Sequence, residues 1–180
     1  MHISNHKTER LFFALWPDSK IRQAINEQSQ IVTQTTDGKV MPSENLHITL
    51  AFLGYVDKPT KDCMQKVAAT VSDNRFSLSL DQLGYWHKSR ILWFGANHIP
   101  EALENLIAHL NTNLQNCGYR PDTRPFHVHL TLMRKVSKLI KKTLPPITPI
   151  IWTVDDFCLV RSVTHSSGAN YEVIARYLLN

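Results

Sequence analysis

The amino-acid sequence predicts a single α+β domain over residues 1–180, in which helices cover antiparallel sheets. Short apolar runs alternate with helix-forming stretches, some strands follow one another in hairpin-like pairs, and a strand–helix–strand pattern occurs in each half. With 43% hydrophobic and 19% charged residues, the 180-residue chain has the composition of one globular domain. The repeated pattern indicates a worn internal duplication, and no long Gly/Ser linker separates the halves, so we expect them to pack together.

The first half begins with an apolar run closed by a proline, RLFFALWP at 10–17, which is typical of a buried strand. Asp18 or Ser19 is suited to cap the helix that follows. The stripe of that helix consists of Ile21, Ile25, Gln28 and Val32. A strand is predicted at 46–54, and Thr60 opens a second amphipathic stretch. Its helical stripe consists of Met64, Val67 and Val71.

The second half begins with a hairpin-like pair, because 75–86 alternates with period two and 90–96 follows after a polar break. The clearest helix lies in 99–118, and Gly118 fits the C′ position at its end. The apolar stripe of this helix consists of Leu103, Leu106, Ile107, Leu110 and Leu114. The remaining strands are predicted at 126–134, 150–162 and 170–179.

Charge and cysteine content limit the partners and the compartment. The net charge of +5 favours anionic partners such as RNA or phosphates. The three cysteines, Cys63, Cys117 and Cys158, are odd in number, widely spaced and form no CxxC, which argues against a disulfide framework or zinc ribbon and for a reducing compartment. The polar start MHISNHKTER lacks the apolar segment of a signal peptide, and no apolar run approaches ~18 residues. We therefore expect a cytoplasmic protein without a membrane span.

Two predicted strands carry an unusual pair of polar residues. The segment NLHITLAFLG holds His47 and Thr49, and FHVHLTLMR repeats the pattern with His129 and Thr131. Side chains at i and i+2 of a strand share a face, roughly 7 Å apart, so each histidine should lie beside its threonine. Roughly 0.1 His-x-Thr-Leu match is expected by chance in this length, and two, one in each half, indicate function.

Regular alternation also predicts which apolar residues of these strands face the core. In the first strand, Ala51 would share the face of the polar pair. The opposite face would consist of Ile48, Leu50 and Phe52. In the second strand, the face opposite the polar pair would consist of Val128, Leu130 and Leu132.

Two histidines that face one cleft form an acid–base pair, because each titrates near neutrality. Threonine hydroxyls beside them would donate hydrogen bonds to the non-bridging oxygens of a phosphate. Arg134, five residues after His129, would supply a fixed positive charge. These groups suit in-line attack on a phosphodiester, with charge stabilised by hydroxyls and a guanidinium rather than by a metal.

These motifs resemble the 2H phosphoesterases, specifically the bacterial and archaeal RNA 2′,3′-cyclic phosphodiesterases, historically called 2′-5′ RNA ligases. The resemblance covers nearly the whole chain. It includes RLFFALWP, ENLHITLAFLG, LGYW…RILWFG, RPFHVHLTLMR and LVRS…GANYEVIARYLL. One departure is Val128, where the group often has proline. This residue is expected to face away from His129.

The resemblance implies two pseudo-symmetric lobes that flank a central cleft, with one His-x-Thr strand from each lobe. It implies hydrolysis of RNA 2′,3′-cyclic phosphate ends to 2′-phosphates, with His129 as the base that activates water. His47 would be the acid that protonates the departing 3′ oxygen. Thr49, Thr131 and Arg134 would hold the phosphate. No cofactor is implied, and the reverse reaction would join RNA ends through a 2′-5′ bond.

Other interpretations of the same residues remain. His127 and His129 share a strand face and, with His47, would form the metal site of a metallohydrolase, although no acidic residue lies beside either motif. A non-catalytic RNA- or nucleotide-binding module would tend to lose one of the two motif histidines.

Phe13 and Tyr171 are candidates for stacking on a base, and both also suit a core. Nothing in the sequence indicates more than a monomer. Packing is the expected role of the tryptophans, Trp16, Trp86, Trp93 and Trp152.

Overall fold

The computed structural model describes residues 8–34, 36–137, 144–165 and 168–180. The helices of this part are α1 (Ser19–Thr33), α2 (Lys58–Ala68) and α3 (Glu101–Gln115), with a short 3-10 turn at Ser43–Asn45. Its strands are β1 (Glu9–Leu15), β2 (Lys39–Val40), β3 (Ile48–Val56), β4 (Phe76–Leu80), β5 (Gln82–Trp86), β6 (Ile91–Gly95), β7 (Leu130–Arg134), β8 (Ile150–Val154), β9 (Asp156–His165) and β10 (Gly168–Leu178).

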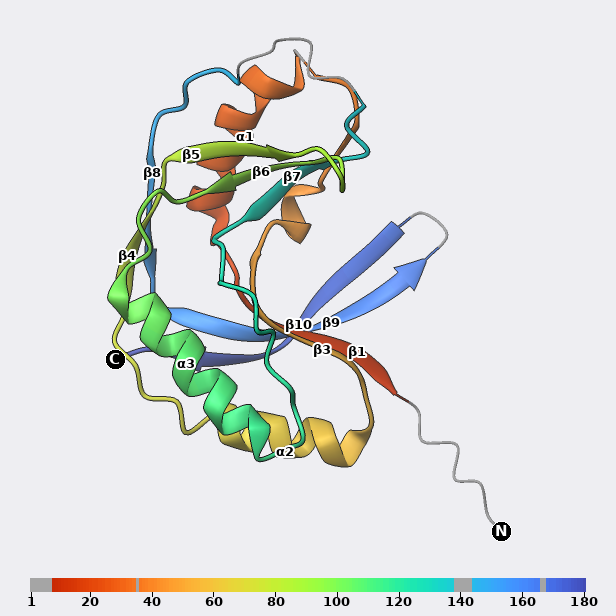
Figure 1. Ribbon diagram of the computed structural model, residues 1–180, viewed down its shortest axis with the longest axis vertical. Coiled ribbons are helices and arrows are strands. Elements are labelled where there is room, and N and C mark those ends of the chain that lie inside the picture. The colour runs from red at the N-terminus through yellow and green to blue at the C-terminus, as the bar shows by residue number, and fades with distance from the viewer. Residues whose placement is uncertain (1–7, 35, 138–143, 166–167) are drawn as a thin grey trace.

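Eight of these strands form one antiparallel sheet in the order β10-β9-β1-β3-β7-β6-β5, with β2 paired to β7. β3 and β7 are joined by one registered pair, Ile48 with Leu130. The sheet therefore divides there into two four-stranded lobes (Figure 1). The predicted α+β fold with one His-x-Thr segment from each lobe is confirmed.

The helices cover the two lobes separately. Figure 1 shows α1 behind the lobe that contains β5, β6 and β7, where it contacts β8, whereas α2 and α3 lie together under the lobe that contains β1 and β3. The face of β1 toward the helices is fully buried through Leu11, Phe13 and Leu15. No helix in the part of the chain that the structure describes is long and apolar enough to cross a membrane.

The helix ends follow local sequence signals. The Asp18 carboxylate accepts a hydrogen bond from the Ile21 amide at 2.8 Å and caps α1, as predicted. At the end of α3, Gly118 has φ +82° and its amide donates to the Gln115 carbonyl at 3.0 Å, which forms the expected glycine stop. α2 begins before the predicted Thr60, because Asp57 caps it.

Two predicted strands are each divided at a corner. The stretch 75–86 becomes β4 and β5, and 150–162 becomes β8 and the first part of β9. β4 and β8 pair with each other in a separate two-stranded sheet. The chain changes sheet at Asp81 and Asp155 while the apolar pattern continues, so periodicity alone gave no sign of the corners. The predicted hairpin is confirmed as β5 with β6.

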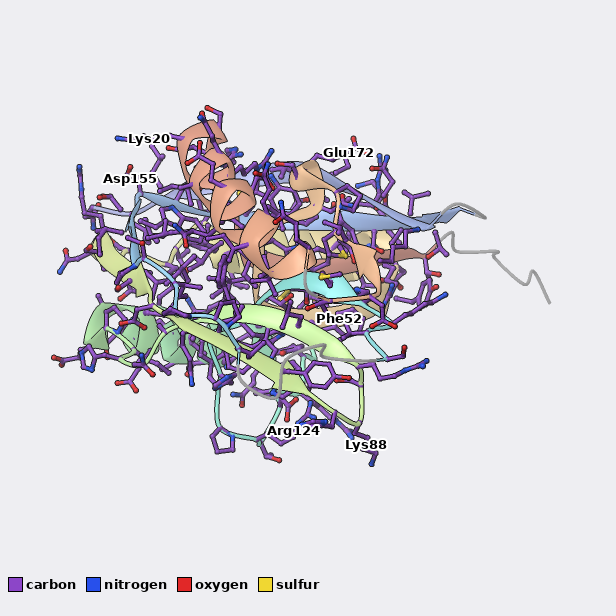
Figure 2. The ribbon with its side chains drawn as sticks, turned by 90° about the horizontal axis from the view of Figure 1, so that it is seen from above. Lys20, Phe52, Lys88, Arg124, Asp155 and Glu172 are labelled. Carbon is purple, nitrogen blue, oxygen red and sulfur yellow. A yellow bond between two sulfur atoms is a disulfide. The ribbon has the colours of Figure 1, made fainter. Side chains whose placement is uncertain are left out.

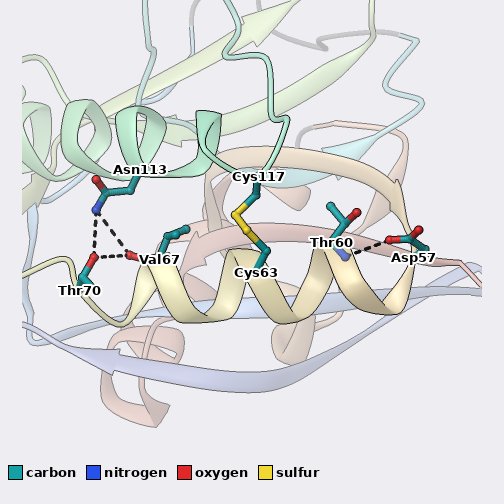
Figure 3. Close-up of a disulfide and its surroundings, with 7 residues drawn as sticks. All are labelled: Asp57, Thr60, Cys63, Val67, Thr70, Asn113 and Cys117. Carbon is teal, nitrogen blue, oxygen red and sulfur yellow. Dashed lines mark hydrogen bonds between the residues drawn. A yellow bond between two sulfur atoms is a disulfide. The ribbon is translucent and has the colours of Figure 1, made fainter.

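A disulfide joins the two helices of the first lobe. Cys63 of α2 and Cys117, just after α3, are bonded with their Cα atoms 5.8 Å apart (Figure 3). The prediction that argued against disulfides was therefore wrong, because a separation of 54 residues does not reveal that the helices pack side by side. Cys158 is free and buried. The prediction of a reducing compartment depended on the cysteines being unpaired, so the disulfide removes its support.

Candidate active site

The first motif lies at the start of β3, which contains a β-bulge. β3 pairs with β1 through Thr49, skips Leu50 and resumes at Ala51, so Leu50 is an extra residue in the ladder. Beyond the bulge the alternation is reversed. Ala51 is 4% exposed in the core, whereas Phe52 is 51% exposed and lines the same pocket as His47. The predicted faces of Ala51 and Phe52 were therefore wrong.

The His47 imidazole is surrounded by aromatic rings. Trp16 stacks on it with centroids 5.5 Å apart, Phe12 lies at 4.9 Å, and Tyr171 meets it edge-on at 5.1 Å. Its Nδ1 donates to the backbone carbonyl of Asn45 at 2.7 Å. Because a carbonyl only accepts, the proton lies on Nδ1, and Nε2 is left to exchange a proton with a ligand.

The second motif holds its histidine in the same way. His129 Nδ1 donates to the His127 carbonyl at 2.9 Å, two residues earlier in the chain, as in the first motif. Trp86 packs against the His129 ring at 4.8 Å, and Trp93 meets the His127 ring edge-on at 4.7 Å. Val128 is 1% exposed in the core, on the side away from the motif, as predicted. Both lobes thus present a histidine whose Nε2 is the available nitrogen.

One pocket gathers residues from both lobes. It is lined by Arg10, Phe12, His47, Thr49, Phe52, Arg134, Ser162 and Tyr171. Four of these, His47, Thr49, Arg134 and Tyr171, were predicted from the sequence. His129 and Thr131 lie on the other side of the single β3–β7 pair, and the charges of Arg134 and His129 both act on His47.

The predicted stacking role of Phe13 was wrong. Phe13 is fully buried and packs at 6.0 Å against both Phe157 and Tyr177 on the helix side of the sheet. The neighbouring Phe12 points to the pocket instead. After Arg10 the run RLFFALWP is apolar on both faces, so only the charged Arg10, two residues before Phe12, indicates which phenylalanine faces the site.

Four pocket residues were not predicted from the sequence: Arg10, Phe12, Phe52 and Ser162. For Arg10 and Phe12 a signal existed, because they alternate along one strand with the fully buried Leu11 and Phe13. Phe52 was hidden by the bulge. Ser162 reaches the pocket through the pairing of β9 with β1, which places it opposite Arg10.

Burial changes the proton affinity of both motif histidines. It lowers the pKa of His47 to about 4, with a smaller lowering by the positive charge of Arg134 and an opposing effect of the Asn45 carbonyl. Burial also lowers the pKa of His129, against the opposing bond to the His127 carbonyl. Both rings are therefore neutral at pH 7 in the free protein. An anion bound beside them raises both pKa values, because it stabilises the protonated form.

The arrangement gives no support to the metal site considered from the sequence. Within residues 8–34, 36–137, 144–165 and 168–180, no three or more His, Cys, Asp or Glu side chains are grouped to hold a metal ion. His47, His127 and His129 all belong to these residues. The His127 ring packs against Trp86 and Trp93 instead.

The low pKa of His47 predicts a loss of stability in acid. From about pH 6.5 down to about pH 4, the unfolded chain binds a proton at His47 that the folded chain does not, so the free energy of unfolding falls. The gap between these pKa values corresponds to at most about 3 kcal/mol. Urea unfolding at pH 7, 5 and 4 measures it, and His47→Gln should flatten the dependence. An equally steep dependence in that variant would contradict this origin.

The sequence of this chain is similar to those of known proteins. Residues 17–165 match a family model described as the 2′-5′ RNA ligase superfamily. The chain is 32% identical over 173 residues to an RNA 2′,3′-cyclic phosphodiesterase of Escherichia coli (strain K12), covering 95% of this chain and 97% of the relative. An RNA 2′,3′-cyclic phosphodiesterase of Archaeoglobus fulgidus is 27% identical over 176 residues, with 91% and 96% covered.

Solved structures show the same fold. The crystal structure of E. coli LigT in apo form matches with a TM-score of 0.86 and 30% identity, covering 97% of this chain and 99% of LigT. The structure of E. coli LigT complexed with 3′-AMP matches with a TM-score of 0.87 and 31% identity at the same coverage.

Proposed function

Because the chain belongs to the 2′-5′ RNA ligase superfamily, we propose that it opens 2′,3′-cyclic phosphates at RNA ends and leaves 2′-phosphates. The relatives from E. coli and A. fulgidus carry the description RNA 2′,3′-cyclic phosphodiesterase, and E. coli LigT has been crystallised with 3′-AMP. The observation that carries the proposal is the pair of histidines, one from each lobe, both anchored through Nδ1. The protein is thus an enzyme, a phosphoric diester hydrolase.

The proposed reaction is an in-line displacement at phosphorus. His129 Nε2 takes a proton from water, the water oxygen bonds to phosphorus, and the bond from phosphorus to the 3′ oxygen breaks. His47 Nε2 gives its proton to the departing 3′ oxygen, so the phosphate stays on the 2′ oxygen. A 5′ hydroxyl in place of water would give a 2′-5′ linkage by the same proton transfers.

The assignment of acid to His47 rests on the family resemblance and has a consequence for its charge. With a pKa of about 4, His47 is neutral in the free protein at pH 7. The ring must therefore gain its proton together with the anionic phosphate, whose charge favours the imidazolium form. In this proposal Thr49, Thr131 and Arg134 donate hydrogen bonds to the non-bridging oxygens, where negative charge increases in the transition state.

The direct test is hydrolysis of adenosine 2′,3′-cyclic phosphate in excess EDTA, with the products separated as 2′- and 3′-phosphate. We expect turnover that EDTA leaves unchanged and a product that is the 2′-phosphate. Activity that is lost in EDTA and restored by zinc would favour a metallohydrolase instead. A protein that binds the nucleotide without opening it would be a binding module.

We also propose that the enzyme acts as a monomer. One chain supplies both His-x-Thr segments and every side chain that lines the pocket, so the site needs no second copy. Light scattering is expected to give a particle of 20.7 kDa, and a dimer mass would refute this. The cytoplasmic location remains a prediction from the sequence, which cell fractionation tests.

A further inference from the structure

His47 stands at a point of the chain that the sheet does not hold. β3 and its pairing with β1 begin one residue later, at Ile48. The 3-10 turn before it ends at Asn45, whose backbone amide donates to the Pro42 carbonyl at 2.9 Å. His47 therefore lies between two regular elements, and the direction of its ring depends on the groups around it.

The hydrogen bond from His47 Nδ1 to the Asn45 carbonyl, at 2.7 Å, directs this ring. Because the bond keeps a proton on Nδ1, a proton that the ring gains together with the substrate must enter at Nε2, the nitrogen that the proposed reaction uses. A neutral ring with its only proton on Nε2 would be a much weaker acid than the imidazolium form. The position of the Asn45 carbonyl therefore decides which form of His47 is available as the acid.

The side chain of Asn45 ties this carbonyl to β10. Asn45 Nδ2 donates to the Ala169 carbonyl at 3.1 Å. β10 lies beside the 3-10 turn, as Figure 2 shows near the label of Glu172. Tyr171, two residues beyond Ala169 on the same strand, meets the His47 ring edge-on at 5.1 Å. One hydrogen bond thus connects two groups that hold the His47 ring, the acceptor of Nδ1 and the ring of Tyr171.

Packing alone does not explain this asparagine. Asn45 is 6% exposed, and its Oδ1 is buried without a hydrogen-bond partner among the residues that the structure describes. Burial of an unpaired amide oxygen costs free energy, so an apolar side chain of the same size would suit the core better. What the amide provides, and an apolar side chain does not, is the hydrogen bond to Ala169.

We propose that the Asn45 side chain is a positioning group for the acid: through its bond to β10 it holds the carbonyl that keeps a proton on His47 Nδ1. Asn45 does not line the pocket and acts through the His47 ring. The inference rests on the proposed function for its effect on catalysis, whereas the tautomer of His47 is a property of the free protein.

The tautomer is measured in the free protein at pH 7, where His47 is neutral. Long-range ¹H–¹⁵N spectra separate a ring nitrogen that carries a proton from one that does not, and comparison with His47→Gln identifies the signals. Wild-type protein should show the Nδ1–H form. Asn45→Leu, which removes the donor at similar volume, should give a mixture with the Nε2–H form, because Nδ1 loses its fixed acceptor. An unchanged Nδ1–H form in this variant would overturn the proposal.

A second variant separates the lost hydrogen bond from altered packing. Asn45→Asp keeps the shape of the side chain, but its carboxylate has no proton to donate to the Ala169 carbonyl. It should show the same mixture of tautomers. The Nδ1–H form alone in Asn45→Asp would mean that side-chain shape, not the bond to β10, holds the carbonyl, and would overturn the proposal.

The effect on catalysis is measured with adenosine 2′,3′-cyclic phosphate. Both Asn45 variants should lower kcat by about 10- to 100-fold with little change in KM, because a misplaced acid weakens transition-state stabilisation more than binding. The matched control is Asn113→Leu. Asn113 Nδ2 also donates to a distant backbone carbonyl, that of Val67 at 3.5 Å, but lies outside the pocket. This control should keep the wild-type tautomer and kcat, and an equal loss of kcat in it would overturn the proposal.

The two measurements distinguish failure of this inference from failure of the proposed function. If wild-type protein opens no cyclic phosphate, the proposed function fails, and the spectra still decide whether Asn45 sets the tautomer of His47. If wild-type protein is active and both Asn45 variants keep its kcat, the positioning role alone fails.

Discussion

Replacement of either motif histidine by alanine is expected to lower kcat for adenosine 2′,3′-cyclic phosphate by about 10²- to 10⁴-fold. Each variant removes one of two proton transfers, and in the part of the chain that the structure describes no other imidazole is anchored in the same way to take over the role. Rapid-quench or steady-state assays of His47→Ala and His129→Ala measure the loss. The double variant should lose little more than the single ones, because two groups that act in one displacement have non-additive effects.

The chain offers a matched control for these variants. His127 lies two residues from His129, and its ring packs against Trp86 and Trp93, while only its backbone carbonyl serves the motif. His127→Ala keeps that carbonyl and should cost less than tenfold in kcat. Thermal unfolding of each variant separates lost chemistry from lost folding. Full activity in His47→Ala or His129→Ala would refute the two-histidine mechanism.

Reduction of the Cys63–Cys117 disulfide is expected to destabilise the protein by about 4 kcal/mol. The bond closes a sequence separation of 54 residues, and cutting it restores the conformational entropy of that loop to the unfolded chain. For a chain of this length the loss corresponds to a fall in Tm of about 8 to 16 °C. Calorimetry with and without reductant measures this fall. The Cys63→Ser/Cys117→Ser variant should reproduce the reduced protein and should not respond to reductant.

The active site should tolerate the loss of this bond at low temperature. Neither cysteine lines the pocket, and α2 and α3 keep a second connection, since Asn113 Nδ2 of α3 donates to the Val67 carbonyl of α2 at 3.5 Å and to the Thr70 hydroxyl just after α2 at 3.3 Å (Figure 3). We expect kcat at 25 °C within about twofold of the oxidised protein, because ~4 kcal/mol is less than the stability of many domains of this size. An unchanged Tm on reduction would show that the two thiols are not bonded in solution.

Much of the fold follows from local signals that act within a few residues. The caps at Asp18 and Gly118 were predicted correctly, because a helix end is decided by its own side chains and backbone conformation. The apolar stripes were predicted correctly except at Val71, which lies beyond the end of α2. The hairpin of β5 and β6 was also predicted correctly, because its two strands are close in sequence and a polar break separates them. The corners at Asp81 and Asp155 were not predicted, because strand partners, not alternation, decide which sheet a segment joins.

The sequence by itself determined which groups the proposed chemistry uses. Two His-x-Thr motifs and an arginine supply the proposed acid–base pair and phosphate-binding groups, and the side chains within a motif lie two residues apart on one face. His47 and His129 could be selected as candidate site residues from the repeated motif alone, without the tertiary contacts of either residue.

Only the tertiary structure decided what surrounds that chemistry. The bulge at Leu50 turns Phe52 to the pocket, the pairing of β9 with β1 brings Ser162 to Arg10, and the packing of α2 on α3 makes the disulfide possible. Each of these outcomes depends on a pairing between segments far apart in the chain. Such pairings are selected by the energies of contacts between distant segments. The pattern of residue types along the chain does not show which segments will be in contact, so the pairings could not be predicted from it.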